Sequence, residues 1–313
     1  MTPAVVMDRA AVEAAVSPER AVEAVRDAFV AHARGDWSMP PKVYVTNYPA
    51  GDFRAMPALG GGHALLKWIT SFPGNPARGL PTVAGIVLVS DASTGELQAV
   101  LDAASVTALR TGAAAVLAAE TLGRGDAETA AVVGAGVNGR AAARTFLARG
   151  RSVALWDVDP TRAAQVASEL GCSVAGSREE ALAADLLVTV TPGHEVVLVD
   201  GSLHPGQHVS LMGADGPGKA EVAGHELARA RLFCDDWEQA SHGGELAHAV
   251  EAGLVVEEDV TAIGAVLAGT APGRATEREI TMFDSTGLAI QDLAIALAAL
   301  DGADQASLPR LEL

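Results

Sequence analysis

A glycine-rich turn between an apolar segment and an expected helix restricts the fold of this chain more than any other feature. The run 131–133 predicts a buried strand, and Gly134, Gly136 and Gly139 follow it with GxGxxG spacing. In this motif the first glycine permits a tight turn, the second lets the backbone approach a pyrophosphate, and the third lets the helix pack against the strand. The first amides of the helix then face the phosphates. We therefore expect a dinucleotide to be bound by Gly134, Gly136, Val137, Asn138 and Gly139.

An acidic residue after the next strand supports this interpretation. The glycines alone are also compatible with an ordinary strand, turn and helix, because glycine is abundant in the chain. However, the apolar run 152–156 predicts a second strand, and Asp157 follows it about 20 residues beyond the glycine turn, where the motif places the acid that binds a ribose 2′-hydroxyl. A carboxylate repels a 2′-phosphate, so Asp157 favours NAD, whereas Arg162 nearby leaves NADP as the alternative.

The composition excludes several other classes of protein. A net charge of −17 argues against nonspecific binding to nucleic acid or to an anionic membrane, so an anionic substrate has to meet a local cluster of basic residues. No apolar run approaches the roughly 20 residues of a membrane span. The 8 histidines show no metal-ligand spacing, and we expect no metal. Cys172 and Cys234 cannot form a disulfide framework, and residues 1–16 lack the pattern of a secretory signal. We therefore expect a cytoplasmic protein.

The pattern of apolar residues predicts a chain with two domains. Between residues 42 and 102 the sequence is strand-like and favours a mostly antiparallel sheet, followed by an alanine-rich helix over 104–120. After Asp157 helices and strands alternate, which is typical of a doubly wound parallel sheet. The clearest of these later elements are a helix over 160–170 and strands over 185–190, 207–212 and 231–234.

The last helix determines how the domains are divided. Residues 288–300 form an apolar helix that we expect to return to the first domain. The fold expected is thus an α/β protein with a Rossmann domain over 120–289. A discontinuous α+β domain over 1–119 and 290–313 is expected to bind substrate and to form a dimer.

Three basic side chains of the first domain are candidates for binding an anion. Lys67 lies within the apolar strand 65–69, although strand alternation alone would also permit it to point to solvent. Arg110 lies in the alanine-rich helix and has an ordinary surface position as its alternative, and Lys42 is the third basic residue. In the second domain Asp215 follows an expected strand, at the sheet edge where such folds bind ligands. Its alternative role is a helix cap or turn residue.

Longer blocks of sequence carry a more specific signal than the glycine turn. With them the chain resembles the ornithine cyclodeaminase/mu-crystallin family and, within it, the archaeal-type alanine dehydrogenases. The blocks cover 39–43, 52–58, 66–68, 75–82 (Asn-Pro-Ala-Arg-Gly-Leu-Pro-Thr), 108–114 (Ala-Leu-Arg-Thr-Gly-Ala-Ala), 213–219 (Gly-Ala-Asp-Gly-Pro-Gly-Lys) and 284–292 (Asp-Ser-Thr-Gly-Leu-Ala-Ile-Gln-Asp).

The resemblance implies a homodimer built through the first domain, a nicotinamide cofactor and a small α-amino or α-imino acid as substrate. It places the lysine matching Lys67 beside the substrate carboxylate and the reacting carbon, and the aspartate matching Asp215 across the pocket. Asp215 is suited to act as the base and to activate water, while Lys67 stabilises negative charge on a carbinolamine oxygen. Arg110 and Lys42 are expected to bind the carboxylate.

Position 54 separates subgroups of the family. Cyclodeaminases that use ornithine carry a glutamate there, which receives the distal ammonium group, whereas this chain has Arg54. Arg54 either binds a carboxylate or is a surface charge at the strand edge. At the position of Lys42 cyclodeaminases usually have arginine, whereas the alanine dehydrogenase subgroup has lysine.

Further cofactor contacts are expected at the ends of strands and in the matching blocks. Thr189 and Thr191 end an expected parallel strand and should line the nicotinamide ribose, and the segment 285–287 should close over the nicotinamide. The remaining expected cofactor-binding residues are Thr82, Thr111, Gly213, Ser285 and Gly287.

These features predict an NAD-dependent oxidoreductase that interconverts L-alanine with pyruvate and ammonia. The alternatives are a reductase of cyclic ketimines such as pyrroline-2-carboxylate and a cyclodeaminase of the ornithine type. A nonenzymatic binding protein like mu-crystallin is an alternative from another class.

Overall fold

The computed structural model describes residues 3–193, 195–214, 216 and 218–312. The chain divides into two compact units, residues 1–110 with 288–313 (unit 1) and residues 111–287 (unit 2). The first boundary therefore lies inside the helix α3 (Ala103–Leu122), about ten residues before the expected position near residue 120. The reason is that the second half of α3, from Ala113 to Ala119, is buried within unit 2.

Unit 1 is built on a sheet of seven strands in the order β15-β1-β6-β5-β4-β3-β2. Only β1 and β6 pair in parallel; the other neighbours are antiparallel, which confirms the mostly antiparallel sheet. The strands are β1 (Ala4–Met7), β2 (Val43–Asn47), β3 (Gly51–Gly60), β4 (His63–Ser71), β5 (Val83–Asp91), β6 (Leu97–Asp102) and β15 (Arg310–Leu311), and a 3-10 turn, η1 (Asn75–Arg78), precedes β5.

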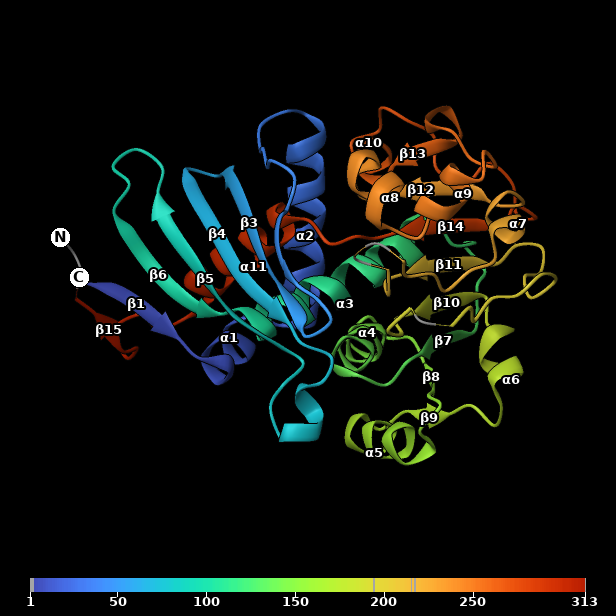
Figure 1. Cartoon of the computed structure of the whole chain (residues 1–313), viewed down its shortest axis with the longest axis horizontal. Coiled ribbons are helices and arrows are strands. Elements are labelled where there is room, and N and C mark those ends of the chain that lie inside the picture. The colour runs from blue at the N-terminus through green and yellow to red at the C-terminus, as the bar shows by residue number, and fades with distance from the viewer. Residues whose placement is uncertain (1–2, 194, 215, 217, 313) are drawn as a thin grey trace. The chain divides into compact units, whose positions relative to one another are not determined.

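Helices cover one face of this sheet. The apolar helix α11 (Ala289–Gly302) runs across β3, β4 and β5, and α2 (Pro18–Ala33) packs against α11, with the short α1 (Arg9–Ala15) nearby (Figure 1). Ser17 caps α2 by accepting the amide of Arg20, and Pro18 starts the helix without losing a hydrogen bond. Along β4 the burial alternates, so that Lys67 lies on the face toward α11 and Trp68 on the opposite face.

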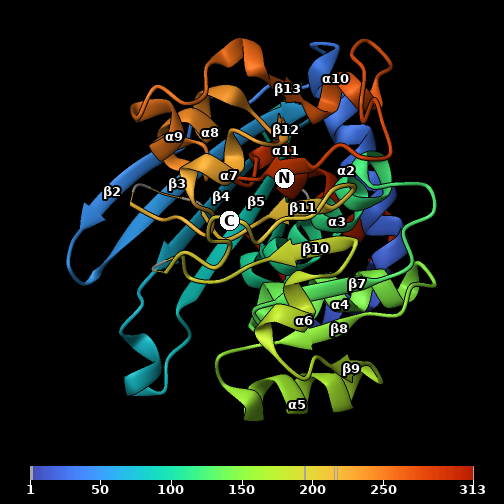
Figure 2. The ribbon, with the colours of Figure 1, turned by 90° about the vertical axis from the view of Figure 1, so that its right-hand side faces the viewer.

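Unit 2 contains a sheet of eight parallel strands in the order β13-β12-β14-β11-β10-β7-β8-β9. The chain leaves β7 (Ala130–Val133) toward β8 (Ala154–Trp156) and β9 (Ser173–Val174), then returns to the other side of β7 with β10 (Leu186–Thr189). Figure 2 shows β7, β8 and β9 in succession, with α5 (Pro160–Leu170) beside the last two. The reversal between β7 and β10 is the point at which doubly wound sheets bind ligands, and the expected Rossmann architecture is confirmed.

The other elements of unit 2 complete the layers around this sheet. The remaining strands are β11 (His208–Leu211), β12 (Arg231–Cys234), β13 (Val260–Ala262) and β14 (Thr281–Asp284). The helices are α4 (Val137–Ala148), α6 (Arg178–Leu182), α7 (Gly224–Leu227), α8 (Trp237–Gly243), α9 (Ala247–Glu251), η2 (Glu257–Asp259) and α10 (Ile263–Leu267). Over the described ranges, no helix is long and apolar enough to cross a membrane.

Candidate active site

A buried cluster of charges in unit 1 contains the predicted lysine. Lys67 is only 1% exposed, and its Nζ donates a hydrogen bond of 2.9 Å to Oδ1 of Asp292, which α11 buries completely. Lys67 therefore does not point to solvent, since it faces the helix-covered side of the sheet. Asp292 belongs to the block 284–292, but its role was not anticipated from the sequence.

The second basic residue of the cluster is Arg110, on α3. Its Nε lies 3.5 Å from the same Oδ1 of Asp292, and its side chain is 12% exposed. Two polar atoms of this group, Nε of Arg110 and Oδ2 of Asp292, are buried and have no hydrogen-bond partner among the residues that the structure describes. Buried polar atoms without partners are costly, so these two atoms are candidates for contacting a ligand.

The cluster changes the proton affinity of Lys67. Burial has the largest effect on the pKa of Lys67 and lowers it, Asp292 opposes burial, and the positive charges of Arg110 and Lys42 act with burial, so that the pKa falls to about 8. Lys42 is a half-buried residue just before β2, and its charge lowers the pKa of Lys67. Of the basic residues predicted to bind the substrate, Lys67, Arg110 and Lys42 form one electrostatic group.

Arg54 is engaged differently. Its Nε donates a 2.6 Å hydrogen bond to Oδ1 of Asp52 and its Nη2 a 3.2 Å bond to Oδ2, and the guanidinium lies over the ring of Tyr44. Arg54 is only 9% exposed, so its alternative interpretation as a surface charge is wrong. Two residues apart on β3, Arg54 and Asp52 share one face of the strand, and the carboxylate of Asp52 pairs with the charge of Arg54.

The glycine turn of unit 2 has the backbone geometry that its sequence predicted. Gly134 has a φ of +105°, and a Cβ there would lie 2.6 Å from the carbonyl oxygen of Val190 at the end of β10. A Cβ on Gly139 would overlap the carbonyl oxygen of Gly134. Around Gly136, by contrast, a Cβ would meet no atom of the described residues within 4 Å. Gly134 and Gly139 are thus required by packing, and Gly136 leaves space for a ligand.

The start of α4 and the acid after β8 lie beside the glycine turn, and together these three parts form a cradle for a dinucleotide. Gly136 is the N-cap of α4 and no side chain caps the helix there, so that the amides at Val137 and Asn138 begin the helix beside open space. Asp157 is buried and accepts hydrogen bonds from the amides of Ala135 (2.7 Å) and Asp159 (2.8 Å). Asp157 therefore stands at the glycine turn, where a ribose of a dinucleotide would be bound, and the arrangement fits such a cofactor.

A buried glutamate joins three of the other predicted cofactor-binding residues. Glu221 accepts the hydroxyl of Thr189 (2.8 Å) and the amides of Thr191 (2.7 Å) and Gly213 (3.0 Å). The amides of Glu221 and Val222 in turn donate to the carboxylate of Glu245. Burial raises the pKa of Glu221, and burial together with the charge of Glu221 raises the pKa of Glu245 to about 9. Neither glutamate was singled out from the sequence, because neither stands in a local motif.

A second buried acid holds the segment 285–287. Asp235, at the end of β12, accepts hydrogen bonds from the hydroxyls of Ser285 (3.2 Å) and Thr286 (3.1 Å) and from the amide of Gly287 (2.8 Å). Asp235 thus fixes the segment that was expected to close over the nicotinamide, and it is another residue that sequence reasoning missed.

The other predicted site residues have less defined surroundings. Thr82 is half-buried just before β5, and Thr111 is buried on α3, where no described residue hydrogen-bonds its hydroxyl. Asp215, the expected base, lies outside the described residues.

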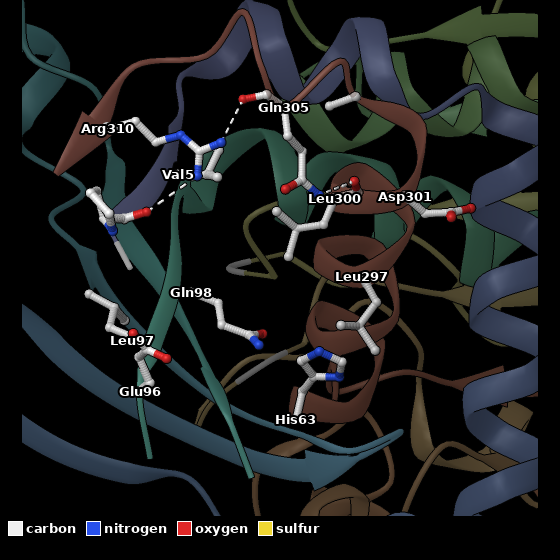
Figure 3. A pocket seen from close by; sticks show the side chains of 12 residues that line it. Val5, His63, Glu96, Leu97, Gln98, Leu297, Leu300, Asp301, Gln305 and Arg310 are labelled. Atoms are coloured by element: carbon white, nitrogen blue, oxygen red, sulfur yellow. Dashed lines mark hydrogen bonds between the residues drawn. The ribbon is translucent and has the colours of Figure 1, made fainter. Parts of the chain in front are cut away.

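A separate hollow of about 740 Å³ lies in unit 1 among β1, β6 and the C-terminal end of α11 (Figure 3). Its walls include His63, Gln98, Asp301 and Arg310, and Arg310 donates hydrogen bonds to the backbone carbonyls of Pro3 and Gln305. None of the residues predicted to bind substrate or cofactor is among the described residues that line it. This hollow is therefore distinct from the charge cluster.

Comparison with known proteins places these features in a family. The model of the ornithine cyclodeaminase/mu-crystallin family matches residues 3–306. The alanine dehydrogenase of Archaeoglobus fulgidus is 42% identical over 301 residues, which cover 93% of this chain and 92% of the relative.

Solved structures agree with this assignment. An archaeal alanine dehydrogenase dimer with bound NAD superposes with a TM-score of 0.94 at 40% identity, and the match covers 100% of both chains. The iminosuccinate reductase of Paracoccus denitrificans, solved in complex with NAD⁺, gives a TM-score of 0.91 at 30% identity, also over 100% of both chains. The resemblance stated from the sequence blocks is confirmed: the chain belongs to the ornithine cyclodeaminase/mu-crystallin family.

Proposed function

We propose that this protein is an NAD-dependent L-alanine dehydrogenase, which interconverts L-alanine and water with pyruvate and ammonia. The observation that carries the proposal is the buried group of Lys67, Arg110 and Asp292, in which Nε of Arg110 and Oδ2 of Asp292 have no hydrogen-bond partner among the described residues. Nε of Arg110 can donate to the carboxylate of a small substrate, and Oδ2 of Asp292 can accept from its amino group. The similarity to the Archaeoglobus alanine dehydrogenase over 93% of the chain supports this substrate class.

The cradle of unit 2 would hold the cofactor. The amides at the start of α4 bind its pyrophosphate, and the carboxylate of Asp157 binds the 2′-hydroxyl of a ribose, which favours NAD over NADP. NAD, when bound, supplies the acceptor for the hydride that leaves the α-carbon of the amino acid. Glu221 and Asp235 keep the backbone at 189–191, 213 and 285–287 in place.

The side chains of unit 1 bind and polarise the substrate. Arg110 presents Nε and the rest of its guanidinium to the carboxylate, and the ammonium groups of Lys67 and Lys42 add positive charge. After the hydride has left, water adds to the carbon of the imine, and Lys67 stabilises the negative charge that develops on the carbinolamine oxygen. Collapse of the carbinolamine releases ammonia and leaves pyruvate.

Proton transfer is assigned to Asp215. The amino group of alanine has to lose a proton as the imine forms, and the attacking water has to lose one as the carbinolamine forms. A carboxylate can accept the proton of the amino group, release it to solvent, then accept the proton of the water and return that proton to the nitrogen that leaves as ammonia.

The dimer proposed for this protein uses the outer face of the unit 1 sheet. Side chains from four neighbouring strands share this face and are at least partly exposed, and Phe53 stacks on Trp68 at 5.7 Å. The set comprises Val43, Val45, Phe53, Leu66, Trp68 and Ile86. A contiguous exposed apolar face of this kind is typical of an interface. The neighbouring alanine dehydrogenase structure is a dimer, which supports a second copy of this chain as the partner.

A substrate panel followed by NADH absorbance tests the proposed activity. Pyruvate with ammonia should support NADH oxidation better than pyrroline-2-carboxylate, iminosuccinate or glyoxylate with ammonia, and L-alanine should support the reverse reaction.

Ornithine should not be converted to proline, because Arg54 occupies the position of the glutamate that receives the distal ammonium in cyclodeaminases. Preferred turnover of a cyclic imine, or proline from ornithine by mass spectrometry, would overturn the assignment. No turnover of any panel member would favour a nonenzymatic binding protein.

A further inference from the structure

One carboxylate in unit 1 contacts both of the cations that bind the substrate in the proposed function. Oδ1 of Asp292 accepts the hydrogen bond from Nζ of Lys67 at 2.9 Å and lies 3.5 Å from Nε of Arg110. We propose that Asp292 is a positioning residue, which holds Lys67 and Arg110 side by side and keeps Lys67 protonated for the substrate. This inference rests on the proposed function, since that function supplies the substrate carboxylate.

The position of Asp292 is unfavourable for a residue with only a structural role. The helix α11 is otherwise largely apolar between Leu293 and Ala299, and it buries Asp292 completely. A buried ion pair often stabilises a fold no better than apolar side chains of similar volume. The Oδ2 atom of Asp292 also has no hydrogen-bond partner among the residues described. The carboxylate is thus better explained by what it does to the two cations than by its contribution to packing.

The groups around Lys67 show why an acid is needed there. The directly paired residues on the neighbouring strands, Met56 on β3 and Val87 on β5, are apolar and buried. The charges that act on Lys67 are those of Arg110 and Lys42, which disfavour its protonated form, and that of Asp292, which favours it. Burial disfavours the protonated form as well, and together these effects lower the pKa of Lys67 to about 8. Without Asp292, burial and the charges of Arg110 and Lys42 would all disfavour the protonated form of Lys67.

Direct titration of Lys67 tests this role without any substrate. The chain contains only three lysines, Lys42, Lys67 and Lys219, so protein labelled with [¹³C,¹⁵N]lysine gives three side-chain signals that can be followed with pH. Lys67→Met assigns the signal. Asp292→Asn should lower the titration midpoint of Lys67 by about one pH unit or more. Asp301→Asn, the same change at an exposed position of α11, is the matched control and should leave the midpoint in place. An unchanged midpoint in Asp292→Asn would overturn the inference.

A second variant keeps the test decisive if Asp292→Asn does not fold. Arg110→Met leaves the pair of Lys67 and Asp292 intact but removes one of the two cations that share the carboxylate. The midpoint of Lys67 should then rise, the opposite direction from Asp292→Asn. A midpoint that stays or falls in folded Arg110→Met would contradict a shared carboxylate.

Kinetics separate positioning from a general loss of structure. At pH 7 Asp292→Asn should raise the KM for pyruvate several-fold, and lowering the pH toward 6 should restore it, because Lys67 becomes protonated again. A purely structural defect would not be repaired by acid. If wild type shows no turnover of pyruvate, the proposed function fails, whereas the titration of Lys67 still decides whether Asp292 controls its proton.

Discussion

The two units prepare for binding in different ways. In unit 1 the proposed recognition depends on charged side chains that are buried and paired, with Asp292 between Lys67 and Arg110. In unit 2 it depends on backbone, since the glycine turn and the start of α4 offer amides and space, and buried acids hold the surrounding strand ends. The dipoles of backbone amides are carried by every residue, whereas a buried charge exists only where one side chain supplies it.

This difference predicts the effect of a substitution in each unit. Removing a charged side chain in unit 1 should affect the substrate and leave the cofactor alone. In unit 2 a side chain added to the turn should affect the cofactor and leave substrate recognition alone.

The largest effect on turnover is expected from Asp215→Asn, because this change removes the proposed general base. The variant tests whether a side chain outside unit 1 takes part in the reaction. Asparagine keeps the shape and hydrogen bonding of the residue but cannot accept a proton. We expect kcat to fall by about 10² to 10⁴, the usual contribution of a positioned general base. The affinity for NADH, measured by fluorescence titration, should be nearly unchanged. Near-normal turnover from pH 7 to 10 would show that Asp215 is a turn residue, and Lys67 would become the first candidate for the proton acceptor.

Arg110→Ala should be the most damaging change to substrate recognition in unit 1. Loss of one partner of a buried ionic hydrogen bond costs about 2 to 5 kcal/mol, so kcat/KM for pyruvate should fall by about 30-fold to 5000-fold. NADH affinity should stay within a factor of about two. Arg20→Ala, at a solvent-exposed arginine of α2, is the matched control and should behave as wild type. Wild-type kinetics in Arg110→Ala would remove this residue from the site.

A pair of glycine variants tests unit 2 in the same way. Gly139→Ala places a Cβ against the carbonyl oxygen of Gly134, so it should lower the unfolding free energy by about 1 to 3 kcal/mol and weaken NADH binding. Gly136→Ala adds the same methyl group where nothing lies within 4 Å, at a φ of −72° that alanine adopts readily. It should leave thermal stability unchanged and weaken NADH binding by about tenfold. Equal NADH affinity in Gly136→Ala and wild type would mean that the cofactor does not approach this glycine.

The sequence predicted the two units unequally well. The glycine turn and Asp157 follow from local spacing, and the helix 160–170 and the strand 231–234 were predicted with their observed bounds. The strand β3 was not singled out, because its sequence contains two glycines, a proline and two charged residues, and it is stabilised by pairing with β2 and β4.

In the charge cluster, Lys67 and Arg110 could be named from the sequence, but their common partner could not. Lys67 and Asp292 are 225 residues apart, and only packing of the C-terminal helix on the sheet brings them together. The same limit applies to Glu221, whose partners lie 8 to 32 residues away, and to Asp235, whose partners are about 50 residues away. Local patterns identify groups that a turn or strand positions alone, whereas contacts between distant segments depend on the finished fold.

The smallest effect is expected from Asp157→Ser, which asks whether one side chain in the backbone cradle sets the choice of cofactor. In wild type the carboxylate should repel the 2′-phosphate of NADPH, so NADH should bind more tightly. Serine removes that charge, and Arg162, whose Nη1 lies 3.4 Å from Oδ1 of Asp157, is then available to a phosphate. NADPH affinity should rise by about tenfold, while NADH affinity falls a few-fold as the ribose contact and the hydrogen bond to Ala135 are lost.

Arg162→Ala in the Asp157→Ser background should reverse the gain for NADPH, which separates the charge effect from a loosened turn. If fluorescence titration showed that wild type binds NADPH tenfold more tightly than NADH, Asp157 would not contact the ribose, and its role would be limited to its bonds with two amides and Arg162.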